Sequence, residues 1–201
     1  VGLDDVGIRP ARIEYEVSAA RPDELALLLA DFWRAARAML VAGPDATAAL
    51  NVLAPAWDDA PFAFTRVLFV ALEANVKAAH AYRDLGVVCF APRYEAPQSW
   101  TGFGHMYSSA TLRRWIAQTY GDDADDAADA RDGPVRASAN YMRRTPHSMI
   151  NVLRAQQLAA AETKRKSPEF YASRMRKLLA IGEDEREAAL ARDRGDAAPG
   201  A

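Results

Sequence analysis

The sequence predicts a mostly helical, all-α core that carries an extended arm at each end. Two observations predict this fold class. Apolar side chains recur at helical spacing between residues 25 and 40, as on a helix that buries one face. Residues 12–17 alternate apolar and charged side chains like a half-buried strand, but no hairpin partner follows them. We therefore expect an N-terminal arm at 1–21, a helical core at 22–166, and a C-terminal helix and arm at 167–201.

The helices are predicted from their start and stop signals. Pro22 opens the first helix, and the pair Gly43-Pro44 ends it. Pro168 falls in the first turn of the last helix, which ends before Gly182. In chain order, helices are expected at 22–43, 46–53, 64–83, 109–120, 137–163 and 168–181.

The composition describes one ordinary domain of 201 residues, half of them apolar. Its formal net charge of −2 excludes a polycation that coats nucleic acid indiscriminately, so any nucleic-acid site must be a local groove. The single cysteine, Cys89, excludes an internal disulfide and a cysteine-based zinc cluster. Thr65 and Arg66 interrupt the longest apolar run, which is too short to span a bilayer. We expect a soluble, cytosolic protein.

One arginine of the segment 73–100 lies in an apolar setting. Arg83 stands between Tyr82 and the apolar run 85–90. An unpaired buried guanidinium is costly, so Arg83 is expected to bind an anion, either a carboxylate or a phosphate. The structural alternatives are an internal salt bridge and an arginine whose charged end reaches solvent.

The charge pattern changes sharply in the last third of the chain. Residues 121–133 are rich in aspartate and predict a solvated loop, whereas residues 136–177 are strongly basic. With Arg113 and Arg114, the arginines of this basic region would line a groove that neutralises a phosphate backbone without reading bases. The alternative is a solvated cationic face that pairs with the aspartate-rich loop.

Signatures of catalysis are weak. The three histidines, His80, His105 and His147, lack metal-ligand spacing. His105 with Ser108 and Ser109 would form a hydrolase fragment, but nothing in the sequence singles out an acidic partner. We therefore expect no enzyme activity, no metal and no cofactor.

Short motifs follow one another in a recognisable order between residues 23 and 166. They are Phe32-Trp33-x-x-x-Arg37, Arg83 with Phe90-Ala91-Pro92, Pro97-x-x-Trp100, and Arg113-Arg114-Trp115. This series resembles the coat proteins of flexuous filamentous plant viruses, the potexviruses most closely and the potyviruses more distantly. Asp45 stands where that family has a turn serine, and Thr119 stands where it has a core aspartate.

The resemblance implies a coat protein that polymerises helically around single-stranded genomic RNA, in a flexible virion assembled in the host cytoplasm. It implies contacts with the RNA backbone without base specificity, contacts between copies through both arms, and no contact with a membrane. The implied RNA-binding positions are Arg83 first, then Arg113, Arg114 and Arg143, with Asp45 and Thr119 nearby. The first alternative is a cellular helical adaptor or nucleic-acid-binding regulator, which would be a discrete monomer or dimer. The second is a small hydrolase that uses His105.

Overall fold

The computed structural model describes residues 12–95, 109–121, 132–157, 159 and 167–195. The chain forms two compact units, and each unit combines two separate stretches of sequence. Unit 1 is 1–93 with 147–164, and unit 2 is 94–146 with 165–201. Several predicted features lie outside the described residues: positions 1–11 of the arm, the motif Pro97-x-x-Trp100, His105 and most of the aspartate-rich loop.

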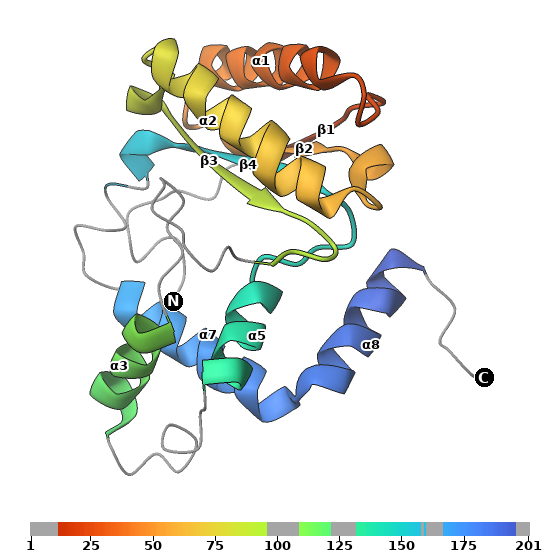
Figure 1. The fold of residues 1–201 in the computed structure, drawn as a ribbon. Helices are drawn as coiled ribbons and strands as arrows, with labels where there is room; N and C mark the ends of the chain where they lie inside the picture. The colour runs from red at the N-terminus through yellow and green to blue at the C-terminus, as the bar shows by residue number, and fades with distance from the viewer. Residues whose placement is uncertain (1–11, 96–108, 122–131, 158, 160–166, 196–201) are drawn as a thin grey trace. The chain divides into compact units, whose positions relative to one another are not determined.

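Unit 1 contains a four-stranded mixed sheet, so the prediction of an all-α core is wrong (Figure 1). The strands are β1 (Arg12–Val17), β2 (Thr47–Leu53), β3 (Leu85–Phe90) and β4 (Met149–Arg154). Their order across the sheet is β1-β2-β4-β3. Strand β1 runs parallel to β2, and β4 is antiparallel to both β2 and β3. Together with its helices, the chain belongs to the α+β class.

Strands β2 and β4 fall inside the helices that were expected at 46–53 and 137–163. Each is a short apolar run, which fits a buried strand and a buried helix segment equally well. The pairing that decides between them is remote in sequence. The side-chain amide of Asn151 donates a hydrogen bond of 2.7 Å to Oδ1 of Asn51, which lies 100 residues earlier. Local periodicity cannot show such a partner.

The structure also differs from the expectation of an extended arm at each end of the chain. Residues 12–17 form a strand, as their alternation predicts, but this strand pairs with β2 of the same chain. At the other end, residues 183–194 form a helix, α8 (Glu183–Arg194), in which Leu190 is buried. The described parts of both segments are therefore integrated into the chain's own two units.

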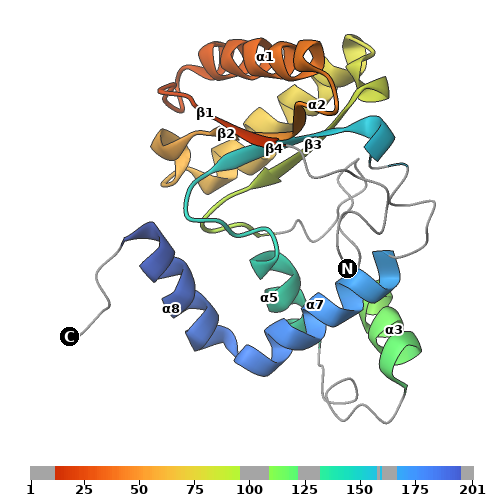
Figure 2. The ribbon, with the colours of Figure 1, turned by 180° about the vertical axis from the view of Figure 1, so that it is seen from behind.

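Two helical segments cover one face of the sheet (Figures 1 and 2). The first, α1 (Leu25–Ala42), buries Leu28 and Phe32 and ends at Gly43, whose φ of 82° favours glycine. The second begins as a π-helix, η3 (Ala63–Leu68), and continues as α2 (Phe69–Ala78). The inward side chains of the sheet that lie beneath this layer include Leu50, Val52, Ile150 and Val152. Helices were predicted at both places.

One carboxylate fixes the loop after β2 to the start of β4. Asp58 follows the short helix η2 (Pro55–Trp57), and its Oδ1 accepts a hydrogen bond of 2.6 Å from the backbone N–H of Ser148. Its Oδ2 lies 2.8 Å from Nδ1 of His147. The backbone N–H of Ala54 donates to the carbonyl of Ser148 at 2.8 Å. Asp58 therefore sets the point at which the chain re-enters the sheet after residue 146.

Unit 2 is helical in its described residues. It contains α3 (Ser109–Tyr120), α5 (Asp132–Tyr141), α7 (Ser167–Ile181) and α8. The first three helices enclose a core formed by Leu112, Ile116, Val135, Ala139, Ala172 and Met175. The predictions of helices at 109–120 and 168–181 are confirmed. No helix in the described ranges combines the length and the apolar character that crossing a membrane requires.

A buried arginine links α8 to the rest of unit 2. Arg186 is 5 % exposed, and its Nη1 donates hydrogen bonds of 2.7 Å to Oγ of Ser138 and to the carbonyl of Leu178. The hydroxyl of Tyr141 donates to the carbonyl of Arg186 at 3.0 Å. These bonds join α5, α7 and α8 through one side chain and its backbone.

The environment of Tyr141 predicts a pH dependence of stability. Burial raises the pKa of its phenol, and the negative charges of Glu187 and Asp193 raise it further. The unfolded chain begins to lose this proton near about pH 10 while the folded state keeps it, so stability falls as the pH rises beyond that value. Tyr141→Phe should remove this alkaline loss and cost about 1 kcal/mol at neutral pH, because its hydrogen bond disappears. Urea unfolding of both proteins at neutral and alkaline pH measures the difference, and an equal alkaline loss in both would contradict the assignment.

Candidate nucleic-acid interface

Helices α3 and α7 pack against each other, and both are basic. Helix α3 has two arginines and no acidic residue, and α7 has three basic residues and one acidic residue. Helix α8 differs from them, with five acidic and three basic residues. Within unit 2, α3 and α7 thus carry an excess of positive charge that α8 does not share.

Arg113 and Tyr120 lie on the same side of α3. They are seven residues apart, which on an α-helix places one above the other two turns away. From α7, the guanidinium carbon of Arg176 lies 4.6 Å from the centre of the Tyr120 ring, within the range of a cation–π contact. Tyr120 is 37 % exposed and Arg176 is also exposed. This arginine–tyrosine contact therefore lies at the surface, with a second arginine on the same side of the helix.

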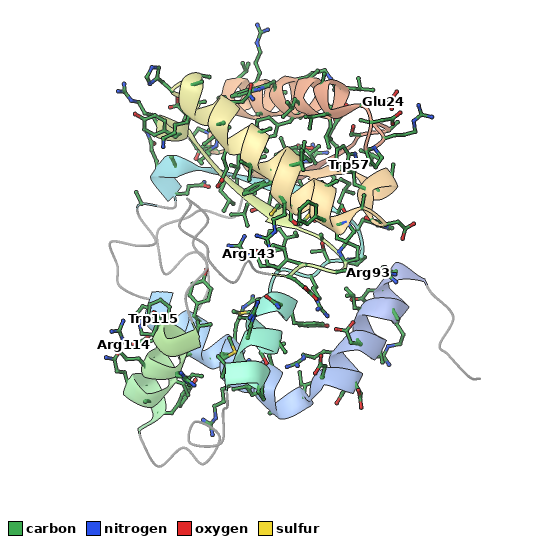
Figure 3. All side chains as sticks on the ribbon, in the orientation of Figure 1. Glu24, Trp57, Arg93, Arg114, Trp115 and Arg143 are labelled. Atoms are coloured by element: carbon green, nitrogen blue, oxygen red, sulfur yellow. The ribbon has the colours of Figure 1, made fainter. Side chains whose placement is uncertain are left out.

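Trp115 and Tyr171 form another aromatic contact between the same two helices. Their ring centres are 6.0 Å apart and their planes are inclined by 32°. Both side chains pack against the core of unit 2 and are partly buried. Arg114, the neighbour of Trp115, is exposed and projects from α3 (Figure 3). Arg114 lies about 100° around α3 from Arg113. We therefore define the basic face of unit 2 as Arg113, Tyr120 and Arg176, with Arg114 beside it.

The chemistry of this basic face suits a single-stranded nucleic acid. Guanidinium groups neutralise phosphates and donate charge-assisted hydrogen bonds to them. A partly exposed aromatic ring offers a surface on which any base can stack, so it tolerates different sequences. Within the described ranges, no three His, Cys, Asp or Glu side chains are grouped in a way that would hold a metal ion.

Two of the sequence-predicted arginines, Arg113 and Arg114, are neighbours on α3, and Arg113 is the one on the side that carries Tyr120. Arg143 follows α5 in the same unit, and its guanidinium carbon lies 5.9 Å from the centre of the Tyr94 ring. The adjacent Arg144 donates to the carbonyl of Tyr94 at 3.4 Å and also pairs with Glu187. Arg143 therefore belongs to a second arginine–tyrosine contact of unit 2.

Arg83 lies in unit 1, in the short helix η4 (Ala81–Arg83). Its side chain is exposed, and its guanidinium carbon is 5.9 Å from the centre of the Tyr82 ring. The guanidinium of Arg83 is therefore open to solvent, and its burial, from which a bound anion was expected, is not observed. Among the residues that the structure describes, the buried arginines are Arg154 and Arg186, and both donate hydrogen bonds to backbone carbonyls.

The remaining predicted positions do not join the basic face. Asp45 is exposed in the turn between α1 and β2 of unit 1. Thr119 is exposed on α3, but six residues separate it from Arg113. At about 100° per residue this spacing places the two on different sides of the helix.

Sequence reasoning did not select Tyr120 or Arg176. The seven-residue spacing between Arg113 and Tyr120 is a readable signal, since it predicts that the two share one side of α3. The contact between Tyr120 and Arg176 has no such signal, because it depends on how α3 and α7 pack. Local spacing could therefore predict that Arg113 and Tyr120 share a side of α3, but it could not predict that Arg176 lies over Tyr120.

Comparison of the chain with protein-family models, with curated proteins and with solved structures gave no match.

Proposed function

We propose that this protein binds single-stranded RNA through the basic face of unit 2. One observation carries the proposal: Arg176 stacks on a partly exposed Tyr120, and Arg113 lies on the same side of α3 as that tyrosine. The two helices that present these side chains carry five basic residues and one acidic residue. Phosphates would bind the arginines, and an unpaired base would stack on the tyrosine.

Binding of this kind has little base specificity, because contacts with phosphate and sugar carry no direct sequence information. It is strongly salt-dependent, because each arginine that neutralises a phosphate releases a bound counterion. A net charge of −2 for the whole chain is compatible with it, since α3 and α7 together carry a local excess of positive charge.

Packaging of genomic RNA in a filament would be one use of such a face, and nucleic-acid binding by a cellular regulator would be another. The all-α core that the resemblance to coat proteins implies is contradicted by the sheet of unit 1. The proposal therefore rests on the basic face and not on the resemblance. Electron microscopy with and without RNA separates the two uses, because a coat protein forms filaments with nuclease-resistant RNA and a regulator forms discrete complexes.

Fluorescence anisotropy with a labelled oligouridine tests the proposal directly. The triple variant Arg113→Ala, Arg114→Ala, Arg176→Ala should raise Kd by about tenfold or more and reduce the salt slope by about 2, since each single-strand phosphate contact contributes about 0.7. Tyr120→Leu, which keeps apolar bulk but removes the ring, should weaken binding about fivefold or more.

Two matched variants control this experiment. Arg192→Ala removes an exposed arginine from α8, the acidic helix of the same unit, and should leave Kd and the salt slope unchanged. Arg83→Ala tests the leading candidate of the sequence analysis in the same assay. If Arg83→Ala weakened binding and the triple variant did not, the site would lie in unit 1 and the proposal would be wrong.

A further inference from the structure

Strand β1 lies at an edge of the sheet, where β2 is its one partner among the described strands. Its apolar side chains are unusually open to solvent: Ile13 is 49 % exposed, Tyr15 61 % and Val17 64 %. An exposed apolar edge strand presents unpaired backbone N–H and C=O groups and can be extended by another strand. This edge is therefore a candidate interaction surface.

The opposite side of β1 carries charged side chains. Arg12 pairs with Glu14 across 3.1 Å, and Glu16 pairs with Arg34 of α1 across 2.7 Å. Glu14 and Glu16 lie on the helix-covered face, because they are in register with Leu50 and Val52, two buried inward residues of β2. Both carboxylates are still partly exposed there. The helix layer therefore leaves the side chains of β1 partly uncovered on this face.

We propose that the edge of β1 pairs with β1 of a second copy of this chain. The two strands run antiparallel about a two-fold axis at Glu14, so that the two sheets become one continuous sheet. In this register, Ile13 of each copy lies opposite Tyr15 of the other on the open face. On the helix-covered face, Arg12 of each copy lies opposite Glu16 of the other.

Strand length and charge complementarity together select this register. An axis at Ile13 would form two Arg12–Glu14 pairs, but it would align only residues 12–14 of the two strands, whereas the axis at Glu14 aligns residues 12–16. Directly opposed side chains of an antiparallel pair interact, favourably when their charges are opposite and unfavourably when they are alike. The proposed register forms two Arg12–Glu16 pairs and one Glu14–Glu14 pair, in which each Glu14 keeps its own Arg12. A shift of two residues, with the axis at Tyr15, would oppose Glu14 and Glu16 twice and place Arg12 opposite Ser18. That shifted register has two like-charge pairs and no opposite-charge pair.

The pairing also accounts for the apolar side chains that β1 leaves exposed. Cross-strand pairs of an aromatic with a β-branched side chain stabilise a sheet, and two Ile13–Tyr15 pairs form symmetrically here. A two-fold interface of this kind uses the same surface on both copies, so one partner occupies it completely. The β1 interface by itself therefore joins two copies and no more, and it predicts a dimer of the protein without RNA.

Two neighbouring substitutions with the same chemistry should act in opposite directions. Glu16→Gln removes the opposite-charge pair on both sides of the axis, and should raise the dimer Kd by about two- to fivefold per pair. Glu14→Gln removes the like-charge pair at the axis and should lower the dimer Kd by about two- to fivefold. Sedimentation equilibrium of the full chain measures both constants. Equal changes in the two variants, or a monomer at every concentration, would overturn the proposal.

Cysteine cross-linking reads the register independently of affinity. The native Cys89 is first replaced by alanine, and single cysteines are then placed at positions 13, 14 and 15. Directly opposed residues of an antiparallel pair have Cα atoms about 4.5–5.5 Å apart, within the range of about 4.4–6.8 Å that a disulfide spans. Glu14→Cys should give a cross-linked dimer on oxidation, whereas Ile13→Cys and Tyr15→Cys should not. A cross-link at position 13 or 15 instead of 14 would overturn the register, and no cross-link at any position would overturn the pairing.

Discussion

Trp57→Ala should destabilise the protein by about 3–5 kcal/mol, the range for truncating a large aromatic side chain in a core. Trp57 is 1 % exposed and packs edge to face against Phe64, with ring centres 5.9 Å apart. Its indole N–H donates to the carbonyl of Ala20 at 2.8 Å, which ties the segment after β1 to the loop after β2. Domains of ordinary stability have a free energy of unfolding of about 5–15 kcal/mol, so this loss is a large share of the total.

Urea unfolding followed by circular dichroism measures the effect of Trp57→Ala. Phe62→Ala is the matched control, because Phe62 is an aromatic residue in the same region that is 73 % exposed. It should change the free energy of unfolding by no more than about 0.5 kcal/mol. Trp57→Phe keeps most of the packing but leaves the carbonyl of Ala20 without its donor, and should cost about 1–3 kcal/mol. Equal losses from Phe62→Ala and Trp57→Ala would show that the indole does not anchor the core of unit 1.

Arg154→Met is expected to destabilise unit 1 by about 2–5 kcal/mol. Arg154 is buried at the end of β4, where its Nε donates to the carbonyl of Thr47 at 3.0 Å and its Nη2 donates to the carbonyl of Met39 at 2.6 Å. The Met39 carbonyl lies in the last turn of α1, so the guanidinium also offsets the partial negative charge of that helix end. Methionine fills the space but leaves two buried carbonyls without a donor, at about 1–3 kcal/mol each.

The control for Arg154→Met is Arg83→Met, the same substitution at an exposed arginine of the same unit. It should alter the free energy of unfolding by no more than about 0.5 kcal/mol. Thermal and urea unfolding of the two variants, compared with the wild type, give both values. If Arg83→Met proved as destabilising as Arg154→Met, Arg83 would hold the interior position that the sequence analysis assigned to it.

The arginines show how far a site can be predicted from this sequence. The run 85–90 is apolar, so the sequence correctly indicated a segment that contributes to the interior, and Leu85 and Cys89 are buried. Arg83 precedes that run but lies outside the strand, in η4, where solvent reaches it. Arg154 lies at the end of a mostly apolar run and is buried, because its guanidinium donates hydrogen bonds to two carbonyls from distant elements. The presence of hydrogen-bond acceptors, and not the apolarity of neighbours in sequence, decides which arginine can be buried.

By itself, the sequence determined the elements whose signals are local. Helix α1 between Pro22 and Gly43, helix α3 with its buried stripe of Leu112 and Ile116, and the alternating strand β1 follow from spacing and from end signals. Only the tertiary structure decided that β2 and β4 are strands and that Arg176 lies over Tyr120. A short apolar run gains similar burial as a strand or as a helix, so its conformation depends on the partner that satisfies its backbone hydrogen bonds. That partner lies about 100 residues away for β2 and β4, beyond the reach of any local pattern.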